Sequence, residues 1–318
     1  MTPDALAPVA VTTRSGIDES VHFGVVVALG PTGEIEFAVG DPSVVVYPRS
    51  SNKPMQAVAM VRAGLDVAPD LLALACASHD GTPAHLAGVR RMLAVAGLDE
   101  SALHNTADLP IDRASAREII RHGGGPTRLQ MNCSGKHAAM LVTSVGAGWS
   151  HDESYLDPAH PLQQRITATI EELTAEPCAH IGVDGCGAPA HAYSLVGLAR
   201  GFRAIATGGA GPAGSSVADA MRGNPVMVGG EHRDVSHLIA RIPGLVAKDG
   251  AQGVFAAALP DGRAVALKIG DGGDRARSPV MVAALRRLGV DVDGLEALVS
   301  EPVLGHGHPV GEVRVIAP

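Results

Sequence analysis

Strand-like patterns stand near both ends of this chain, and their placement is the strongest constraint on its fold. Residues 21–30 and 34–40 are rich in Val, Ile and Phe and flank Pro-Thr-Gly, which predicts a β-hairpin. Residues 253–259 and 263–269 flank Pro-Asp-Gly and predict a second hairpin. Residues 44–47 predict a further short strand.

Helical periodicity occupies the middle of the chain. The spacing of apolar residues predicts helices over 55–64, 84–97, 162–173 and 190–207, with a late helix over 279–289. Glycine-rich segments between these stretches are typical of loops.

Strands at both ends and helices between them favour an α+β fold over alternating βαβ units. The simplest assembly joins the two terminal hairpins in one antiparallel sheet and inserts the helical region between them. We therefore expect a single catalytic domain over 1–318. Its sheet part covers about 1–53 and 245–318, and its mainly helical part about 54–244.

Charge and hydropathy exclude several classes of protein. The net charge is -8 and no basic stripe is present, so nucleic acid is not an expected partner. Every apolar stretch of 18 or more residues is interrupted by charged residues, glycine or proline, so a membrane partner is not expected either. The first residues do not resemble a signal peptide, and four cysteines do not suggest a disulfide scaffold. A cytoplasmic location follows as an expectation.

Lysine is scarce. Only four of the 25 lysine and arginine residues are lysines, namely Lys53, Lys136, Lys248 and Lys268. Unlike arginine, lysine can lose its proton and act as a base or a ligand. The scarcity therefore marks these positions as candidates for chemistry, although chance retention is the alternative.

Ser50 and Lys53 form the first candidate pair. Ser50 or Ser51 is a natural N-cap, and Pro54 suits the first turn of the helix that follows. A serine three residues before a lysine at a helix start places both side chains on one face. A lysine kept near neutrality by burial or by another cation can take the hydroxyl proton. The alternative is a capping serine beside a solvated lysine, which is common.

Asn132-Cys-Ser-Gly-Lys-His137 gathers reactive side chains around one glycine. It is not a phosphate-binding P-loop, because Gln130 stands where the first glycine belongs and no Ser or Thr follows Lys136. Cys133, Lys136 and His137 are candidate metal ligands. A surface turn with one buried cysteine is the alternative.

Asp184-Gly-Cys186 is a second glycine-spaced turn, and it carries a carboxylate and a thiol. Cys186 and Cys133 could complete a zinc site across space, although their spacing matches no structural zinc finger. Two buried free thiols are the alternative.

Ser78 and Lys268 are the remaining candidates. Ser78 is followed by His79 and Asp80, but adjacent Ser, His and Asp side chains point apart and do not make a triad. Ser78 is therefore interpreted as a second hydroxyl. Lys268 lies at the end of a predicted strand, where an inward lysine would be costly unless used.

Together these segments resemble the bacterial L-asparaginase II family, a lineage unrelated to the periplasmic threonine asparaginases. The family's fold is similar to that of serine β-lactamases and glutaminases, which agrees with a split sheet and an inserted helical region. The matching segments are Arg49-Ser-Ser-Asn-Lys-Pro-Met-Gln56, Ala77-Ser-His79, Asn132-Cys-Ser-Gly-Lys-His137, Asp184-Gly-Cys-Gly-Ala-Pro189, Met227-Val-Gly-Gly230 and Lys268-Ile-Gly-Asp-Gly272.

The resemblance implies hydrolysis of L-asparagine to L-aspartate and ammonia by two Ser–Lys tandems, in a homodimer. Ser50 would attack the side-chain amide, Lys53 would accept its proton, and a Ser78/Lys268 relay would protonate the leaving ammonia. A zinc ion, tuning substrate handling rather than performing hydrolysis, is implied as cofactor. Its ligands would be Cys133, Lys136 and Cys186. The substrate-binding residues would be Arg49, His137 and Asp184.

The chain departs from the family pattern at two places. Asp80 stands where many relatives carry serine, and Gln130-Met131 replaces a more familiar His-Asn. Both changes bear on substrate preference.

Two alternatives stay open. A penicillin-recognising serine hydrolase shares Ser-x-x-Lys, and a zinc-binding protein without catalysis would keep the cysteines and Lys136.

Overall fold

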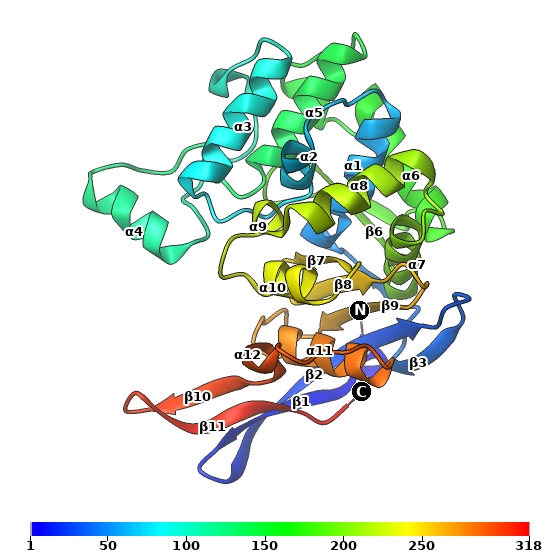
Figure 1. Cartoon of the computed structure of the whole chain (residues 1–318), viewed down its shortest axis with the longest axis vertical. Helices are drawn as coiled ribbons and strands as arrows, with labels where there is room; N and C mark the ends of the chain where they lie inside the picture. The colour runs from blue at the N-terminus through cyan, green and yellow to red at the C-terminus, as the bar shows by residue number, and fades with distance from the viewer. Residues whose placement is uncertain (1, 318) are drawn as a thin grey trace.

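The chain folds into a large antiparallel sheet with a helical region above it (Figure 1), in a computed structural model that describes residues 2–317. Within that range eight strands form the sheet in the order β10-β11-β1-β2-β9-β8-β7, with β3 paired to the far part of β2. Its strands are β1 (Ala7–Arg14), β2 (Ile17–Leu29), β3 (Ile35–Val39), β7 (Val246–Gly250), β8 (Val254–Ala258), β9 (Ala264–Ile269), β10 (Glu301–Gly305) and β11 (His308–Val315).

The segment between β3 and β7 is mainly helical. It also holds a small sheet in the order β4-β6-β5, made of β4 (Val45–Val46), β5 (His180–Val183) and β6 (Pro189–Ser194). The helices are α1 (Lys53–Arg62), α2 (Pro69–Ala75), α3 (Pro83–Val95), α4 (Arg113–Arg121), α5 (Ser134–Gly146), α6 (Pro161–Thr174), α7 (Leu195–Ala206), α8 (Gly211–Gly223), α9 (Pro225–Val228), α10 (Asp234–Arg241), α11 (Arg277–Arg287) and α12 (Glu296–Val299). Short 3₁₀ turns occur at Pro3–Ala5, Arg49–Asn52, Glu100–Ala102 and Glu153–Leu156.

The centre of the sheet joins the two ends of the chain. β2 pairs with β9 over Gly24–Ile269 to Leu29–Ala264, so the predicted N- and C-terminal hairpins do lie in one antiparallel sheet. The expected strand at 44–47 forms as β4, but it pairs with β6 in the small sheet. The large sheet also contains β1, β7, β10 and β11, which periodicity alone did not reveal.

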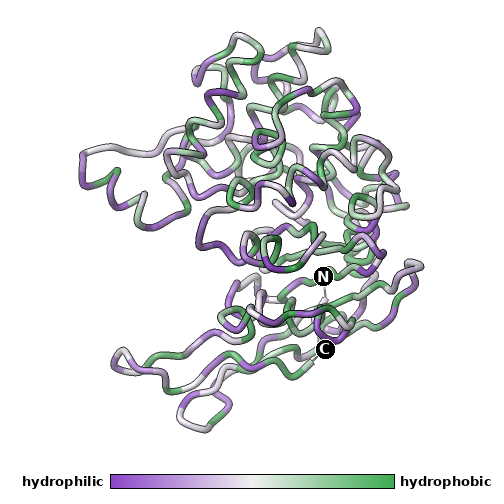
Figure 2. The backbone as a smooth tube through the Cα atoms, in the orientation of Figure 1, coloured by the Kyte–Doolittle hydropathy of each residue, from purple (hydrophilic) through white to green (hydrophobic). Residues whose placement is uncertain are grey.

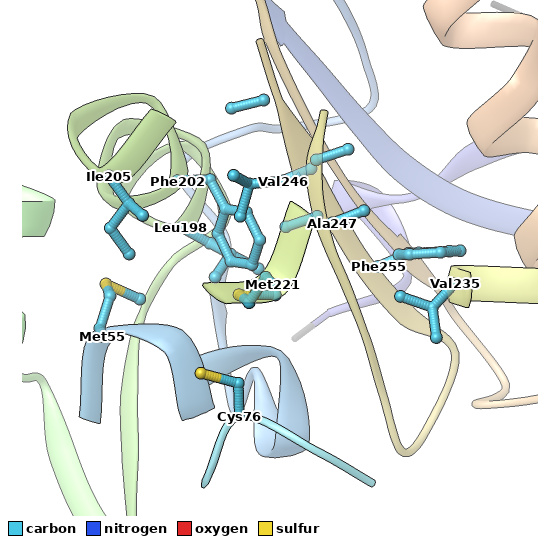
Figure 3. Packing of buried hydrophobic residues seen from close by; sticks show 14 of the residues in the cluster. Met55, Cys76, Leu198, Phe202, Ile205, Met221, Val235, Val246, Ala247 and Phe255 are labelled. Atoms are coloured by element: carbon cyan, nitrogen blue, oxygen red, sulfur yellow. The ribbon is translucent and has the colours of Figure 1, made fainter. Parts of the chain in front are cut away.

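Both faces of the sheet centre are covered, since every residue of β8 and β9 is buried. α7 packs against β8 and β9, and α11 contacts β9 and β11. Phe202 of α7 lies beside Val246 of β7, and Ile205 lies on the side of Met55 of α1 (Figure 3). Apolar residues follow the central strands, whereas hydropathy changes from residue to residue along the outer hairpins (Figure 2).

The helix expected over 190–207 is wrong in its first part. Residues Pro189–Ser194 form β6, which pairs with β5, and α7 begins only at Leu195. Ser194 sets the boundary because its side chain accepts a hydrogen bond from the Gly197 N–H as an N-cap. No helix in the described part of the chain is long and apolar enough to cross a membrane.

Candidate active site

Ser50 lies in the turn that connects the small sheet to α1. The 3₁₀ turn Arg49–Asn52 runs directly into α1, whose second residue is Pro54. Ser50 is half-buried and lines a cavity of about 300 Å³ together with Ser78. The two candidate hydroxyl groups, 28 positions apart in sequence (78 minus 50), therefore face the same space.

The turn is not capped as the sequence suggested. Asn52 occupies the N-cap position of α1 without a capping side-chain bond, and Ser51 Oγ instead donates to the Lys248 carbonyl at 2.9 Å. This bond ties the turn to β7. The next residues of β7 come equally close: a Cβ atom on Gly250 would lie 2.4 Å from the Pro48 carbonyl oxygen. Only glycine fits this approach.

Arg49, immediately before Ser50, adopts a left-handed backbone with φ of 55°. Such a conformation is unfavourable for a residue with a Cβ and persists only where neighbouring contacts hold it. Here the guanidinium is held by Asp184, with Nη2 at 2.6 Å and Nε at 2.8 Å from Oδ1. The structure thus brings together Arg49 and Asp184, two of the predicted substrate-binding residues.

Lys53 is almost fully buried, with 1% of its surface exposed. Its Nζ donates to the Ala77 carbonyl and to Ser78 Oγ, the latter at 3.2 Å. Within residues 2–317, Ser50 Oγ makes no hydrogen bond, so the Ser–Lys contact that is formed joins Lys53 to Ser78. Catalytic hydrogen bonds are often completed only when substrate binds. Both Ser50 and Ser78 line the same cavity, where a bound substrate could contact either hydroxyl group.

Ser78 is positioned by its backbone. It follows α2, its N–H donates to the Val228 carbonyl at 3.1 Å, and the next N–H, of His79, donates to Asn132 at 3.1 Å. These bonds connect the Ser78 loop to two of the segments that carry the family resemblance.

Lys268 is not brought to Ser78. Its Nζ donates to the carbonyls of Gln252 at 2.7 Å and Ile269 at 2.6 Å, and no bond to Ser78 exists in the part of the chain that the structure describes. The reason is topological. β9 pairs Lys268 with Val25 of β2 and Val254 of β8, and the ammonium group satisfies carbonyls at the strand end.

Lys248 is the lysine whose pKa is affected by the charge of Lys53. It is fully buried on β7, and its Nζ donates to the carbonyl of Asp249 at 2.8 Å and to the carboxylate of the same residue. Burial lowers the pKa of Lys248 to about 8, because the Asp249 charge offsets only part of the desolvation and the Lys53 charge adds to the lowering. The sequence drew attention to Lys248 only through the scarcity of lysine.

This shift predicts a pH-dependent stability. Between pH 8 and pH 10.5 the unfolded chain, with the usual lysine pKa of 10.5, binds a proton that folded Lys248 has lost. The free energy of unfolding therefore rises with pH in this window, by about 3 kcal/mol relative to a Lys248→Met variant. Denaturant unfolding of both proteins at the two pH values measures the difference. A difference that does not change with pH would contradict the shift.

Asp80 connects the Ser78 loop to this network. It is buried and paired with Arg233, whose Nη1 lies 3.3 Å from Oδ1, and burial raises the pKa of Asp80 against the opposing Arg233 charge. The other nitrogen, Arg233 Nη2, lies 2.6 Å from Asp249 Oδ2. A Cβ on Gly230 would collide with the Asp80 carboxylate, at 1.8 Å from Oδ2. The acid at this position is thus accommodated by a glycine and neutralised by an arginine.

Cys133, Lys136 and Cys186 meet in a buried cluster at the start of α5. Lys136 Nζ donates to Cys186 Sγ at 3.2 Å, and all three residues are buried. The adjacent Cys133 thiol lowers the pKa of Cys186 well below its usual range, burial opposes this shift, and the Lys136 ammonium adds to it. A thiolate paired with an ammonium group follows.

His137 lies beside the same cluster. Its Nδ1 bonds to the Tyr155 hydroxyl at 2.8 Å, while its buried Nε2 has no hydrogen-bond partner among the described residues. Burial lowers the pKa of His137, which favours the neutral ring.

The donor chemistry of this cluster fits zinc. Two thiol sulfurs are ligands that zinc prefers, and an unpartnered imidazole nitrogen stands next to them. Within residues 2–317, His, Cys, Asp and Glu side chains alone do not assemble a group of three or more around a metal position. Lys136 Nζ, which donates to Cys186 Sγ, is the nitrogen next to the two thiols.

Gln130 and Met131 flank the cluster. Met131 packs against Cys133 and Cys186, and its sulfur accepts the Cys133 N–H at 3.1 Å. The Gln130 Oε1 atom is buried and has no partner in the described range. This departure from the family pattern therefore changes the wall beside the thiols.

Comparison with known proteins gives one match over nearly the whole chain. The family model described as L-asparaginase II matches residues 10–315. No curated protein matches the sequence.

Solved structures show weaker likeness. Mglu in its native form has 14% identity and a TM-score of 0.46, covering 86% of this chain and 67% of that one. A putative β-lactamase from Bacteroides dorei has 17% identity and a TM-score of 0.44, covering 83% and 93%. A β-lactamase from Mycobacterium bovis has 16% identity and a TM-score of 0.40, covering 83% and 94%.

Proposed function

The chain belongs to the L-asparaginase II family of amidohydrolases, and on that premise we propose that it hydrolyses L-asparagine to L-aspartate and ammonia through an acyl-enzyme on Ser50. The proposal is supported by one cavity that both Ser50 and Ser78 line. At this cavity Lys53 Nζ donates a hydrogen bond to Ser78 Oγ. A hydroxyl nucleophile needs an adjacent base, and a buried lysine supplies one.

In the proposed first step Ser50 Oγ attacks the side-chain amide carbon. Lys53 takes the hydroxyl proton, directly or through Ser78 Oγ, with which it already shares a hydrogen bond. The C–N bond then breaks, and the nitrogen leaves as ammonia with that proton. Water enters along the reverse route and hydrolyses the β-aspartyl ester.

Charge that develops on the amide oxygen requires N–H donors. Candidates are the backbone N–H of Ser50 and that of Ala251, which follows β7 and lines the cavity. The Ala251 N–H donates no hydrogen bond within the described range. Preorganised donors of this kind are worth a large part of the rate enhancement in acyl transfer.

Lys248 replaces Lys268 in our proposal as the second lysine of the site. Its support is the buried position beside Lys53, whereas Lys268 is occupied by two carbonyl groups. Asp249 pairs with the Lys248 ammonium, and Arg233 in turn pairs with the other oxygen of Asp249.

Zinc belongs to the proposal as a modulatory cofactor held by Cys133, Lys136 and Cys186. When bound, it would supply positive charge in place of the Lys136 ammonium and compensate the thiolate. Arg49, Asp184, Lys53 and Lys136 line one small cavity. We propose that the metal affects substrate handling through the residues that line this cavity.

Four further parts of the proposal rest on the sequence. They are a single catalytic domain, a fold of the serine β-lactamase and glutaminase type, a homodimeric assembly and a cytoplasmic location. For the fold type, the support is the antiparallel sheet built from both ends of the chain with a helical region inserted.

Ammonia release tests the function directly. The purified protein should release ammonia from L-asparagine, and turnover should change when a chelator removes zinc, since the metal adjusts but does not perform the chemistry. Parallel assays with L-glutamine and a chromogenic cephalosporin separate the alternatives. Cephalosporin turnover without ammonia release would favour a penicillin-recognising hydrolase. A melting temperature that shifts with zinc but no turnover would indicate a non-catalytic zinc protein.

A further inference from the structure

The cavity that contains Ser50 and Ser78 is lined by charged side chains of both signs. Arg233 and Asp249 come from the helical region and from β7, and Asp274 and Arg277 from the segment that leads into α11. The volume of about 300 Å³ is at the small end of the range for ligand pockets. Such a cavity suits a small, polar and charged substrate.

Three of these charges are already neutralised in the wall. The Asp249 carboxylate accepts from Lys248 and from Arg233, and its side chain is only 4% exposed. Arg277, with 9% of its side chain exposed, donates to Asp234 at 2.9 Å. These groups shape the cavity but have little charge left to offer a ligand.

Asp274 is different. Its side chain is 67% exposed, and Oδ1 accepts from Arg277 Nη1 at 2.9 Å. The second oxygen, Oδ2, accepts no hydrogen bond from any residue in the range 2–317. Arg277 therefore fixes the direction of a carboxylate that still has an open acceptor atom at the mouth of the cavity.

An ionised carboxylate accepts hydrogen bonds and cannot donate them. Its best ligand is a cationic donor, and a charge-assisted bond of this kind is stronger than a neutral one. Asparagine carries one such group, the α-ammonium, two carbon atoms away from the amide carbon that Ser50 would attack. The reacting group and the charged group would thus occupy one cavity.

We propose that Asp274 receives the α-ammonium group of the substrate and makes the enzyme selective for amides of α-amino acids over amides that lack a free amino group. This inference rests on the proposed function, because it takes the amide to lie at Ser50. Asp274 then acts as a specificity residue rather than as part of the hydrolytic machinery.

Two substrates that differ only in the amino group provide the test. Succinamate is asparagine without its α-amino group, and it still carries the same amide and carboxylate. Wild-type protein should prefer L-asparagine in kcat/KM. In Asp274→Asn the kcat/KM for L-asparagine should fall about tenfold, the scale of one charge-assisted hydrogen bond at an exposed position. The value for succinamate should stay unchanged.

A matched control exists on α8. Asp219 also pairs with the arginine three residues on, Arg222, through Oδ1 and Nη1, and its side chain is 76% exposed. Asp219→Asn removes the same charge and should leave both kcat/KM values as in the wild type. A general effect of lost negative charge would appear in both variants.

The ratio of the two kcat/KM values decides the matter. If Asp274→Asn lowers kcat/KM for L-asparagine and for succinamate by the same factor, the ratio stays as in the wild type. That result overturns the inference, while asparagine hydrolysis stands. Should the wild-type protein hydrolyse neither amide, the proposed function fails and this inference fails with it. Loss of the preference in Asp274→Asn alone supports it.

Discussion

Replacing Ser50 by alanine should abolish ammonia release from L-asparagine, lowering kcat by several orders of magnitude. Without Oγ at position 50 no acyl-enzyme forms by the proposed route, in which the Ser78 hydroxyl, bonded to Lys53, only relays the proton. Stability should hardly change, since the half-buried Ser50 hydroxyl makes no hydrogen bond within the residues described. Steady-state ammonia assays and thermal melts measure the two quantities.

The control for this variant is a serine elsewhere on the surface. Ser154 lies exposed in the 3₁₀ turn Glu153–Leu156, and Ser154→Ala should retain wild-type kcat and KM. The informative contrary result is near-normal turnover in Ser50→Ala together with an inactive Ser78→Ala. That outcome would move the nucleophile to Ser78, the hydroxyl that Lys53 contacts in the structure.

Replacing Lys53 by methionine should be equally damaging to turnover and should leave the fold intact. The lysine is almost fully buried, and burying a charge has a desolvation cost. Methionine fills a similar volume without that charge. We therefore expect kcat to fall by several orders of magnitude, with a melting temperature equal to or above that of the wild type.

Lys268→Met serves as the matched substitution. Like Lys53, Lys268 is a buried lysine, but it lies near the end of β9 and its ammonium group bonds to two carbonyls rather than to Ser78. We expect this variant to keep most of its activity. The contrary result is a Lys268→Met variant that has no turnover but a normal melting temperature, together with a Lys53→Met variant that stays active. That result would assign Lys268, and not Lys53, to the catalytic tandem.

The sequence predicted those features that depend on short stretches of chain. The hairpins around Pro31-Thr-Gly33 and Pro260-Asp-Gly262 are present as β2–β3 and β8–β9. They could be predicted because the turn residues and the two strand patterns that flank them lie in one short stretch of sequence. Their union in one sheet also followed from the order of elements. The strand β6 was interpreted as helix, since a short buried run has no distinctive period.

The site was harder to predict where it depends on distant contacts. Ser50 and Lys53 are neighbours, so spacing alone proposed them. Lys248 comes to Lys53 only because β7 docks on the Ser50 turn, and no local pattern encodes that contact. The left-handed Arg49 has no sequence signature either, since its conformation depends on Asp184.

The close approach of Gly250 to the Pro48 carbonyl has a consequence for how the protein matures. The turn that carries Ser50 is made early during synthesis, but the strand that buttresses it is made about two hundred residues later, since β7 begins at Val246. During elongation domains fold as units, and contacts distant in sequence form late. A nascent chain therefore exposes its serine and lysine without the neighbouring cation or the Ala251 N–H. The wall of the cavity that contains Ser50 is therefore complete only after the C-terminal strands have joined β2.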